Sequence, residues 1–408
     1  MSKKILVVTQ YFWPENFRVN ELVLGLHRQG HQIEILTSIP NYPTGSIFAE
    51  YKNNPLQYSS YNGIKVHRVK QILRGNNKFT LALNYISFVV SACIYSLIYL
   101  RKNHYDTILA IQLSPIFSVI PAILCKYIFK SPLYMWVLDI WPDSLFASNT
   151  KDGYIYKSIN KVCFYIYSSA ENLFLSSKGF KDRLLEMGIE RTKLEYMPQW
   201  VEEEYTIDLR HDSIEAKEVK SILSRWSEKK IFLFAGNIGE AQDFDNVLLS
   251  FKKSSRLEEM VFLILGDGRY KKKLKQLINK HSLEENVFLL GRYSSKFMPY
   301  FYNYSSILVF SLSTNPIFSL TLPGKIQSYM SSGTTIIGMV EGESSAVIND
   351  AKCGFTVPSG DVNGFSKLID RCCFYSDDEL NSIGANGKEY AFKNFNYDLT
   401  IEKLSKKI

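Results

Sequence analysis

The chain has 408 residues, 46% of them hydrophobic and 22% charged, which is the composition of a globular protein of about two domains. That much apolar surface excludes an intrinsically disordered chain. The six cysteines form no C-x-x-C pair, so we predict no zinc site and expect reduced thiols, as in a cytosolic protein. The N-terminal segment MSKKILVVTQ lacks the long apolar run and cleavage site of a signal peptide.

A strand–helix–strand unit opens the predicted fold. Residues 4–9 (KILVVT) form a short apolar run typical of a buried parallel strand, and residues 17–28 carry apolar side chains at helical spacing. Residues 32–37 (QIEILT) form the next strand, and such units build parallel sheets with helices on their faces. Four further strands are predicted in this sheet, at residues 107–111, 133–138, 171–175 and 194–197.

Residues 51–138 combine basic charge with an uncharged apolar segment. They contain ten Lys and Arg and one acidic residue, Asp106, in a chain of net charge +8. Residues 83–100 carry no charge and reach the lower limit of a membrane span. Two interpretations stay open: a helix partly pressed against an anionic bilayer, or a fully buried core helix. A nucleic-acid surface is not favoured, because the basic residues do not interleave with exposed aromatic residues along a groove.

A second α/β half follows a polar segment. Residues 230–235 (KIFLFA) form a strand, the glycine-containing loop GNIGEAQDFDN comes next, and residues 247–251 belong to a helix. This order repeats the pattern at the start of the chain. Further strands are predicted at residues 261–265, 287–290, 307–310 and 334–337.

The predicted fold class is therefore α/β, with two Rossmann-like, doubly wound parallel-sheet domains. The first covers residues 1–200, residues 201–229 form a linker with a surface helix, and the second covers residues 230–390. Residues 391–408 form a C-terminal helix that could cross back to the first domain. Because ligands bind outside the carboxyl ends of parallel strands, we expect both domains to face a cleft between them.

The segment LTLPGKIQSYMSSG places Lys325 just inside a predicted helix start. Proline suits the first helical turn, glycine lets a ligand approach the backbone, and the free N–H groups attract anions. A lysine at this position can bind a diphosphate and stabilise the charge on a departing nucleotide. The alternative is an exposed lysine on a surface helix.

Two glycine-containing loops after predicted strands are further candidates for donor binding, and a β-turn explains Gly266–Gly268 equally well. Their residues are Gly236, Asn237 and Gly239 in the first loop and Gly266, Asp267, Gly268 and Arg269 in the second. Asp243 and Asp245 could suggest a divalent metal. We predict none, because aspartate at a helix start is common capping chemistry.

The first domain offers candidates for acceptor binding and catalysis. Glu15, Asn16 and Arg18 stand where the first strand meets its helix, and helix capping with a surface ion pair is the alternative. Asp139 follows a strand within WVLDIWPDS and is well placed for catalysis, and Trp141 offers a face for sugar stacking. The alternative for Asp139 is a structural residue that caps the turn before Pro142.

In order and spacing, these segments resemble the retaining glycosyltransferases of family 4, which have the two-domain GT-B fold. Within that family the chain most resembles the WbuB-type L-fucosamine transferases of bacterial O-antigen and capsule assembly. The resemblance covers nearly the whole chain and is carried by YFWPEN…ELVLGLHRQGHQIEILTSIPNYP, WVLDIWPDS, GNIGEAQDFDNVLLSF, LGDG with LLGRYSSKFMPYFY, LTLPGKIQSYMSSG and CGFTVPSGD.

The resemblance implies a nucleotide-sugar donor, with UDP as first choice, bound mainly by the C-terminal domain with Lys325 on the β-phosphate. It implies a sugar such as N-acetyl-L-fucosamine, transferred with retention and without a metal or other cofactor. The implied acceptor is a polyprenyl-diphosphate-linked sugar bound by the N-terminal domain at the inner face of the cytoplasmic membrane. The protein would then be cytoplasmic and peripherally associated with that membrane.

The chain also departs from the family pattern. Many members have two glutamates eight positions apart, and the second position is here Ser328, beside Gln327. Asn16-Phe17 replaces a glycine pair, and no histidine stands at residues 112–115. Contacts of those glutamates cannot be carried over, so Gln327 and Ser328 are the donor-side candidates and Asp139 the catalytic one.

Two rival functions remain open. A nucleotide-sugar 2-epimerase shares the GT-B fold and needs no acceptor. A catalytically silent GT-B subunit that binds a partner enzyme or a lipid would explain the missing glutamates. A dehydrogenase is disfavoured, because the chain has no G-x-G-x-x-G fingerprint.

Overall fold

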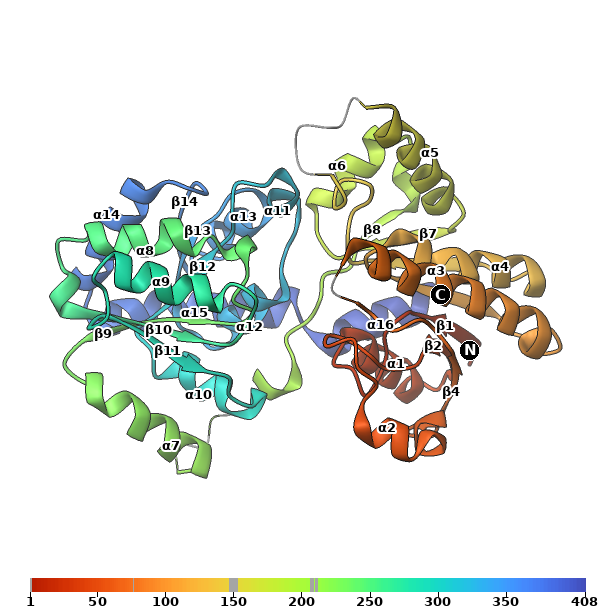
Figure 1. The fold of residues 1–408 in the computed structure, drawn as a ribbon, viewed down its shortest axis with the longest axis horizontal. Helices are drawn as coiled ribbons and strands as arrows, with labels where there is room; N and C mark the ends of the chain where they lie inside the picture. The colour runs from red at the N-terminus through yellow and green to blue at the C-terminus, as the bar shows by residue number, and fades with distance from the viewer. Residues whose placement is uncertain (1, 76, 147–152, 206–208, 210–211) are drawn as a thin grey trace. The chain divides into compact units, whose positions relative to one another are not determined.

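A computed structural model describes residues 2–75, 77–146, 153–205, 209 and 212–408. The chain divides into two compact units, which are described separately (Figure 1). The N-terminal unit contains Met1–Pro198 and Asp398–Ile408, and the C-terminal unit contains Gln199–Tyr397. Part of the predicted linker, at residues 206–208 and 210–211, lies outside the described residues.

The N-terminal unit is built on an eight-stranded sheet. All its neighbouring strands are parallel except the first pair, β3 and β4, as predicted for βαβ units. This pair was not predicted, because the alternating segment IKVHRV is not an apolar run. In spatial order the strands are β3 (Ser60–Tyr61), β4 (Ile64–Val69), β2 (Gln32–Ser38), β1 (Lys4–Val8), β5 (Thr107–Gln112), β6 (Leu133–Val137), β7 (Asn172–Leu175) and β8 (Leu194–Tyr196).

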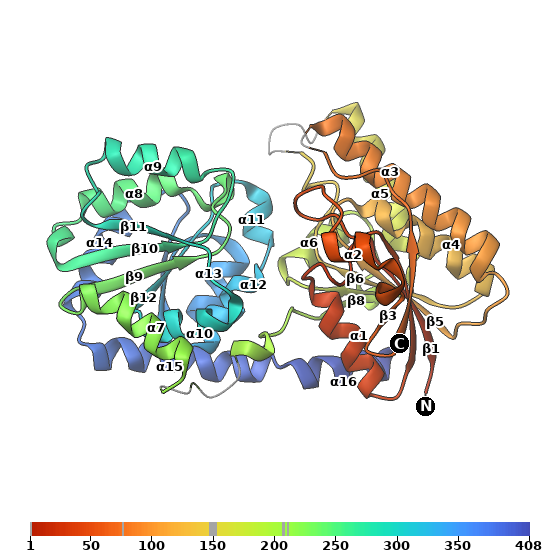
Figure 2. The same ribbon diagram turned by 60° about the horizontal axis from the view of Figure 1, so that its bottom comes forward.

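Helices cover this sheet (Figures 1 and 2). The last helix belongs to this unit although its sequence follows the second sheet: Lys3 Nζ donates to the Ile408 carbonyl at 2.6 Å, and His31 Nε2 lies 2.8 Å from Ser405 Oγ. The helices are α1 (Arg18–Arg28), α2 (Ala49–Asn53), α3 (Lys78–Tyr95), α4 (Ile120–Phe129), α5 (Tyr154–Ser168), α6 (Gly179–Glu186) and α16 (Tyr397–Lys407).

Helix α3 continues as a π-helical turn at Ser96–Leu100, and it packs on α4 and on strands β2 and β4. The helical segment Lys78–Leu100 has a mean hydropathy of 1.9. By length and composition alone, it is long and apolar enough to cross a membrane. Only 22% of that window is buried, so a fully buried core helix is the wrong interpretation. Its exposed apolar residues include Phe79, Ile86, Val90, Ile94, Leu97 and Ile98.

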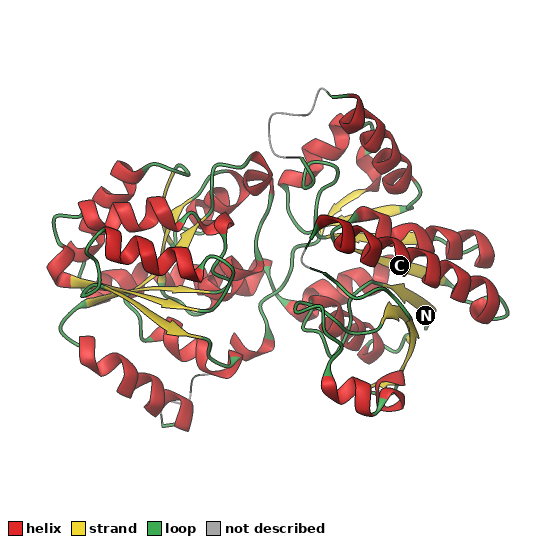
Figure 3. Cartoon of the chain, in the orientation of Figure 1, coloured by secondary structure: helices red, strands yellow, loops and turns green. Residues whose placement is uncertain are grey.

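The C-terminal unit holds a six-stranded parallel sheet between two layers of helices (Figure 3). Apolar side chains on the two faces of the central strands enter separate hydrophobic clusters, as expected for a sheet buried on both sides. The strands in order are β11 (Val287–Gly291), β10 (Met260–Leu265), β9 (Lys230–Ala235), β12 (Ile307–Ser311), β13 (Thr335–Met339) and β14 (Gly354–Val357). The helices are α7 (Ile214–Leu223), α8 (Phe244–Lys253), α9 (Lys271–Lys280), α10 (Met298–Asn303), α11 (Pro316–Leu320), α12 (Gly324–Ser331), α13 (Gly342–Asp350), α14 (Val362–Phe374) and α15 (Asp377–Asn394).

Candidate functional site

The loops after β9 and β10 lie side by side at the carboxyl end of the second sheet. The Gly236 N–H donates to the Leu265 carbonyl at 2.9 Å, and the Ile238 N–H donates to the Asp267 carbonyl at 2.9 Å. Gly266 has φ +135°, and a Cβ there would stand 1.8 Å from the Gly236 carbonyl oxygen. The backbones can approach this closely only because Gly266 has no side chain.

Lys325 joins these two loops from the start of α12. Pro323 occupies the N-cap position, and the Lys325 side chain then crosses Gly236. A Cβ on Gly236 would lie 2.7 Å from Lys325 Nζ. The ammonium lies 3.7 Å from the centre of the Phe234 ring, which is a cation–π contact. The structure therefore brings together three segments that the sequence predicted separately.

The electrostatic state of Lys325 is unusual for a lysine. The residue keeps part of its surface exposed, but protein atoms surround its ammonium, and this desolvation lowers its pKa to about 7. Among the described residues it forms no ion pair. A cation that is desolvated and lacks a carboxylate partner favours a bound anion.

Other donor-side candidates take supporting positions. Gln327 is buried, and in the orientation that satisfies its amide it donates to the carbonyls of Pro323 (2.8 Å) and Gly324 (2.9 Å). Ser328 is also buried, and its hydroxyl donates to the Gly324 carbonyl at 3.4 Å. Both side chains therefore stabilise the first turn of α12 where we had expected ligand contacts.

The loop residues themselves stay nearer the surface. The exposed Asp267 carboxylate accepts the Gly268 N–H at 2.9 Å and pairs with Lys271 at 3.4 Å. Arg269 is exposed at the end of the same loop. In the first loop, a Cβ at Gly239 would stand 2.8 Å from the Asn237 amide nitrogen.

The two aspartates near α8 do not cap it as expected. Asp243 occupies the N-cap position with φ +49°, but its side chain makes no capping bond and instead accepts from Asn246 at 2.8 Å. Asp245 accepts from the Tyr270 hydroxyl and pairs with Lys273 at 3.3 Å. Within the described ranges, no three His, Cys, Asp or Glu side chains gather as metal ligands.

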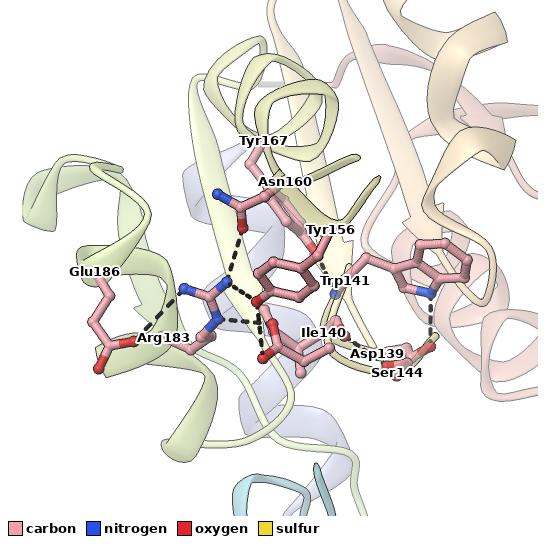
Figure 4. A network of polar contacts seen from close by, with 10 residues as sticks. Asp139, Ile140, Trp141, Ser144, Tyr156, Asn160, Tyr167, Arg183 and Glu186 are labelled. Carbon is pink, nitrogen blue, oxygen red and sulfur yellow. Dashed lines mark hydrogen bonds and ion pairs between the residues drawn. The ribbon is translucent and has the colours of Figure 1, made fainter. Parts of the chain in front are cut away.

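Asp139 lies in the loop after β6, in the N-terminal unit (Figure 4). One carboxylate oxygen accepts from the Ser144 hydroxyl and the other from Trp141 Nε1 at 3.1 Å. Burial raises the pKa of the Asp139 carboxyl, although these hydrogen bonds and one from Ser114 favour the ionised form. The carboxyl is partly exposed, so it can still reach a ligand.

Trp141 does not present the sugar-stacking face that we expected. It is only 6% exposed, and its indole N–H is shared between Asp139 and Ser114, the latter at 3.2 Å. Its backbone N–H donates to the Tyr167 hydroxyl at 3.1 Å. Trp141 therefore positions the Asp139 loop, and we assign it no acceptor contact.

A buried ion pair, which was not predicted from the sequence, holds the other end of this loop. Arg183 on α6 donates to Asp143 at 2.7 Å and to Tyr156 and Asn160 on α5, both at 2.8 Å (Figure 4). The side chains of Arg183 and Asp143 are 12% and 3% exposed. The only signal was Asp143 itself, since its partners lie on helices without a recognisable motif.

The three acceptor-side candidates near α1 are arranged differently from the expectation. Glu15 is buried and accepts three backbone N–H groups, from Phe12 (3.1 Å), Asn41 (2.8 Å) and Tyr42 (2.7 Å). Burial raises its pKa to about 6 against these bonds. Glu15 therefore joins the loops after β1 and β2, and its buried carboxylate accepts from their backbone N–H groups.

The positions of Asn16 and Arg18 do not by themselves indicate a ligand contact. Phe17 takes the N-cap position of α1, so the exposed Asn16 is not the cap. Arg18 pairs with Glu21 at 3.5 Å, as in the surface ion pair considered from the sequence.

Residues 216–390 match the family described as Glycosyl transferases group 1. This match contains both glycine loops and Lys325.

Comparisons over longer stretches agree. The chain is 24% identical over 283 residues to the probable glycosyltransferase WbjE of Pseudomonas aeruginosa, covering 67% of each protein. It is 23% identical over 302 residues to the putative colanic acid biosynthesis glycosyl transferase WcaI of Escherichia coli K12, covering 70% of this chain and 71% of WcaI. The crystal structure of Anabaena HepE in complex with UDP and glucose superposes with a TM-score of 0.71 at 13% identity, covering 99% of both chains. The fold is therefore GT-B, with two Rossmann-like parallel-sheet units.

Proposed function

We propose that the protein is a retaining, metal-independent glycosyltransferase that transfers a sugar from a UDP-sugar donor to a polyprenyl-diphosphate-linked acceptor, with UDP as the leaving group. The carrying observation is the Lys325 ammonium, which crosses Gly236 without an ion-pair partner among the described residues. The family match over residues 216–390 and the UDP bound in HepE support a nucleotide-sugar donor. The name of WcaI, a putative colanic acid biosynthesis glycosyl transferase, supports a role in bacterial polysaccharide synthesis. We take N-acetyl-L-fucosamine as the first sugar to test.

The proposed reaction has one group transfer. An acceptor hydroxyl forms a bond to the anomeric carbon from the face that the diphosphate leaves, and the bond from that carbon to the β-phosphate oxygen breaks. Lys325 stabilises the charge that gathers on the departing diphosphate. Asp139 takes the proton of the attacking hydroxyl, a role for which a raised carboxyl pKa is useful.

Nucleotide titration tests this proposal. We expect UDP to bind the wild type with micromolar Kd, and Lys325→Ala to weaken binding by about tenfold or more, roughly 1.4 kcal/mol. Calorimetry with UDP, GDP and their N-acetylated sugar conjugates also identifies the base. Lys280→Ala removes an exposed lysine from the same unit and should leave Kd unchanged.

The same titration has a pH dependence with a defined sign. Only the protonated ammonium attracts the diphosphate, and the pKa of Lys325 without ligand is about 7. The contribution of Lys325 to UDP affinity should therefore be full below about pH 7 and fall as pH rises through about 7. Lys325→Ala should remove this component. If no nucleotide binds the wild type, the transferase proposal fails and a silent GT-B subunit remains. Turnover of a sugar nucleotide to its epimer without acceptor would establish the 2-epimerase alternative.

We further propose that α3 holds the protein against the inner face of the cytoplasmic membrane. Ile86, Val90, Ile94 and Ile98 recur every four residues, so they share one exposed helix face. Lys78 begins the helix, and Arg101 and Lys102 follow its end. An apolar helix face with basic ends matches an anionic bilayer surface.

Vesicle co-sedimentation tests the membrane contact. With phosphatidylglycerol vesicles, Ile94→Glu should lower the bound fraction by about tenfold, because it places a charge in the apolar contact. Ile214→Glu is the matched control, since Ile214 is an exposed isoleucine on α7 in the other unit. Equal binding of both variants would exclude α3 as the membrane contact.

A further inference from the structure

Arg74 lies in the segment that joins β4 to α3 and is packed tightly there. Its backbone N–H donates to Asn41 Oδ1 at 3.2 Å. Gly45 has φ +78°, and a Cβ at that position would lie 2.0 Å from the Arg74 carbonyl oxygen. The segment is therefore held against the loop that follows β2, and the position of Arg74 is defined by backbone contacts.

The guanidinium of Arg74 is surrounded by tyrosines. Its Nη1 donates to the hydroxyls of Tyr11 at 3.2 Å and Tyr85 at 3.3 Å, and its carbon lies 5.3 Å from the centre of the Tyr42 ring. Burial raises the pKa of the Tyr11 hydroxyl further above its ordinary value, so this partner is neutral. Among the described residues, Arg74 has no carboxylate partner, and its Nε and Nη2 groups donate to none of them.

Two other arginines of the same unit show the contrast. Arg68 donates to the carbonyl oxygens of Tyr58 (3.0 Å), Ser38 (3.0 Å) and Trp13, and Arg183 pairs with Asp143. Both have structural partners for their charge or for their N–H groups. Arg74, which is partly exposed, keeps open donors in the planar geometry that binds an oxyanion in bidentate fashion.

The surroundings define the rest of the ligand. Tyr85 is on α3, next to Ile86, where the exposed apolar face of that helix begins. A ligand that uses both features has an anionic head and an apolar tail. We infer that Arg74, with Tyr11 and Tyr85, binds the diphosphate of the lipid-linked acceptor while its isoprenoid chain follows α3. This inference rests on the proposed function and names the acceptor-side group that recognises the lipid diphosphate.

Titration with farnesyl diphosphate tests the inference in the Lys325→Ala background, which removes the donor-side cation. We expect binding in that background, and about tenfold weaker binding or more when Arg74→Gln is added. Arg74→Lys keeps the charge but loses the paired donors, so it should weaken binding about threefold. Arg191→Gln removes an exposed arginine elsewhere in the unit and should change nothing. Tyr85→Phe gives a second variant, with about threefold loss, should Arg74→Gln fail to fold.

UDP titration of the single variant Arg74→Gln separates the two proposals. Unchanged UDP binding with weakened farnesyl diphosphate binding supports the site. Unchanged farnesyl diphosphate binding when Arg74→Gln is added to the Lys325→Ala background overturns it, whatever UDP does. Inorganic pyrophosphate that binds as tightly as farnesyl diphosphate overturns the lipid assignment. If the wild type does not bind UDP, the donor proposal fails, but the effect of Arg74→Gln on farnesyl diphosphate binding can still be interpreted.

Discussion

Replacing Arg183 with methionine is expected to lower the free energy of unfolding by about 3–5 kcal/mol, because it removes the charged partner of a buried carboxylate. Arg183 and Asp143 are both nearly buried, so solvent screens their interaction little. The variant also loses the bonds to Tyr156 and Asn160 that tie α5 to α6. Urea unfolding followed by circular dichroism measures the loss.

The double variant Asp143→Leu/Arg183→Met provides the decisive comparison. Replacing both charges by apolar groups of similar size is often neutral, so most of the lost stability should return. Arg191→Gln, at an exposed site, should stay within about 0.5 kcal/mol of the wild type. A single Arg183→Met variant that unfolds like the wild type would show that the ion pair contributes no net stability.

Asp139→Asn is expected to lower kcat by about 10²–10⁴, because an amide cannot accept the proton of the acceptor hydroxyl. The substitution keeps the size of the side chain, and Asp139 belongs to the N-terminal unit, so the Kd for UDP should not change. Release of UDP from the sugar nucleotide, measured with a lipid-linked acceptor, reports the rate. If Asp139→Asn keeps the wild-type kcat, Asp139 supports its loop and is not the base.

The pH profile separates catalysis from support. The base must be ionised, and burial raises the pKa of Asp139, so activity should rise with pH through a value above the ordinary aspartate range. Asp139→Asn should abolish this acidic limb. Ser144→Ala removes one hydrogen bond to the carboxylate but keeps the base, so it should shift the limb to higher pH and leave most of kcat.

The local elements of the fold could be predicted from the sequence, because each depends on residues that are neighbours along the chain. β9 was predicted with the bounds Lys230–Ala235 that the structure shows, since a fully buried parallel strand is a continuous apolar run. Strand β4 was missed because its sequence alternates, although its neighbour β2 fixes its place in the sheet. Lys325 was found because a proline–glycine–lysine segment is a local signal for a helix start.

The sequence by itself therefore determined the two parallel-sheet halves, the helix start at Lys325 and the apolar segment that became α3. Only the tertiary structure decided which polar groups are free to meet a ligand. Glu15 is taken up by backbone N–H groups, while the guanidinium of Arg74 keeps open donors. The physical reason is that hydrogen bonds and desolvation depend on partners far apart in the chain, and periodicity and spacing report only on neighbours along it.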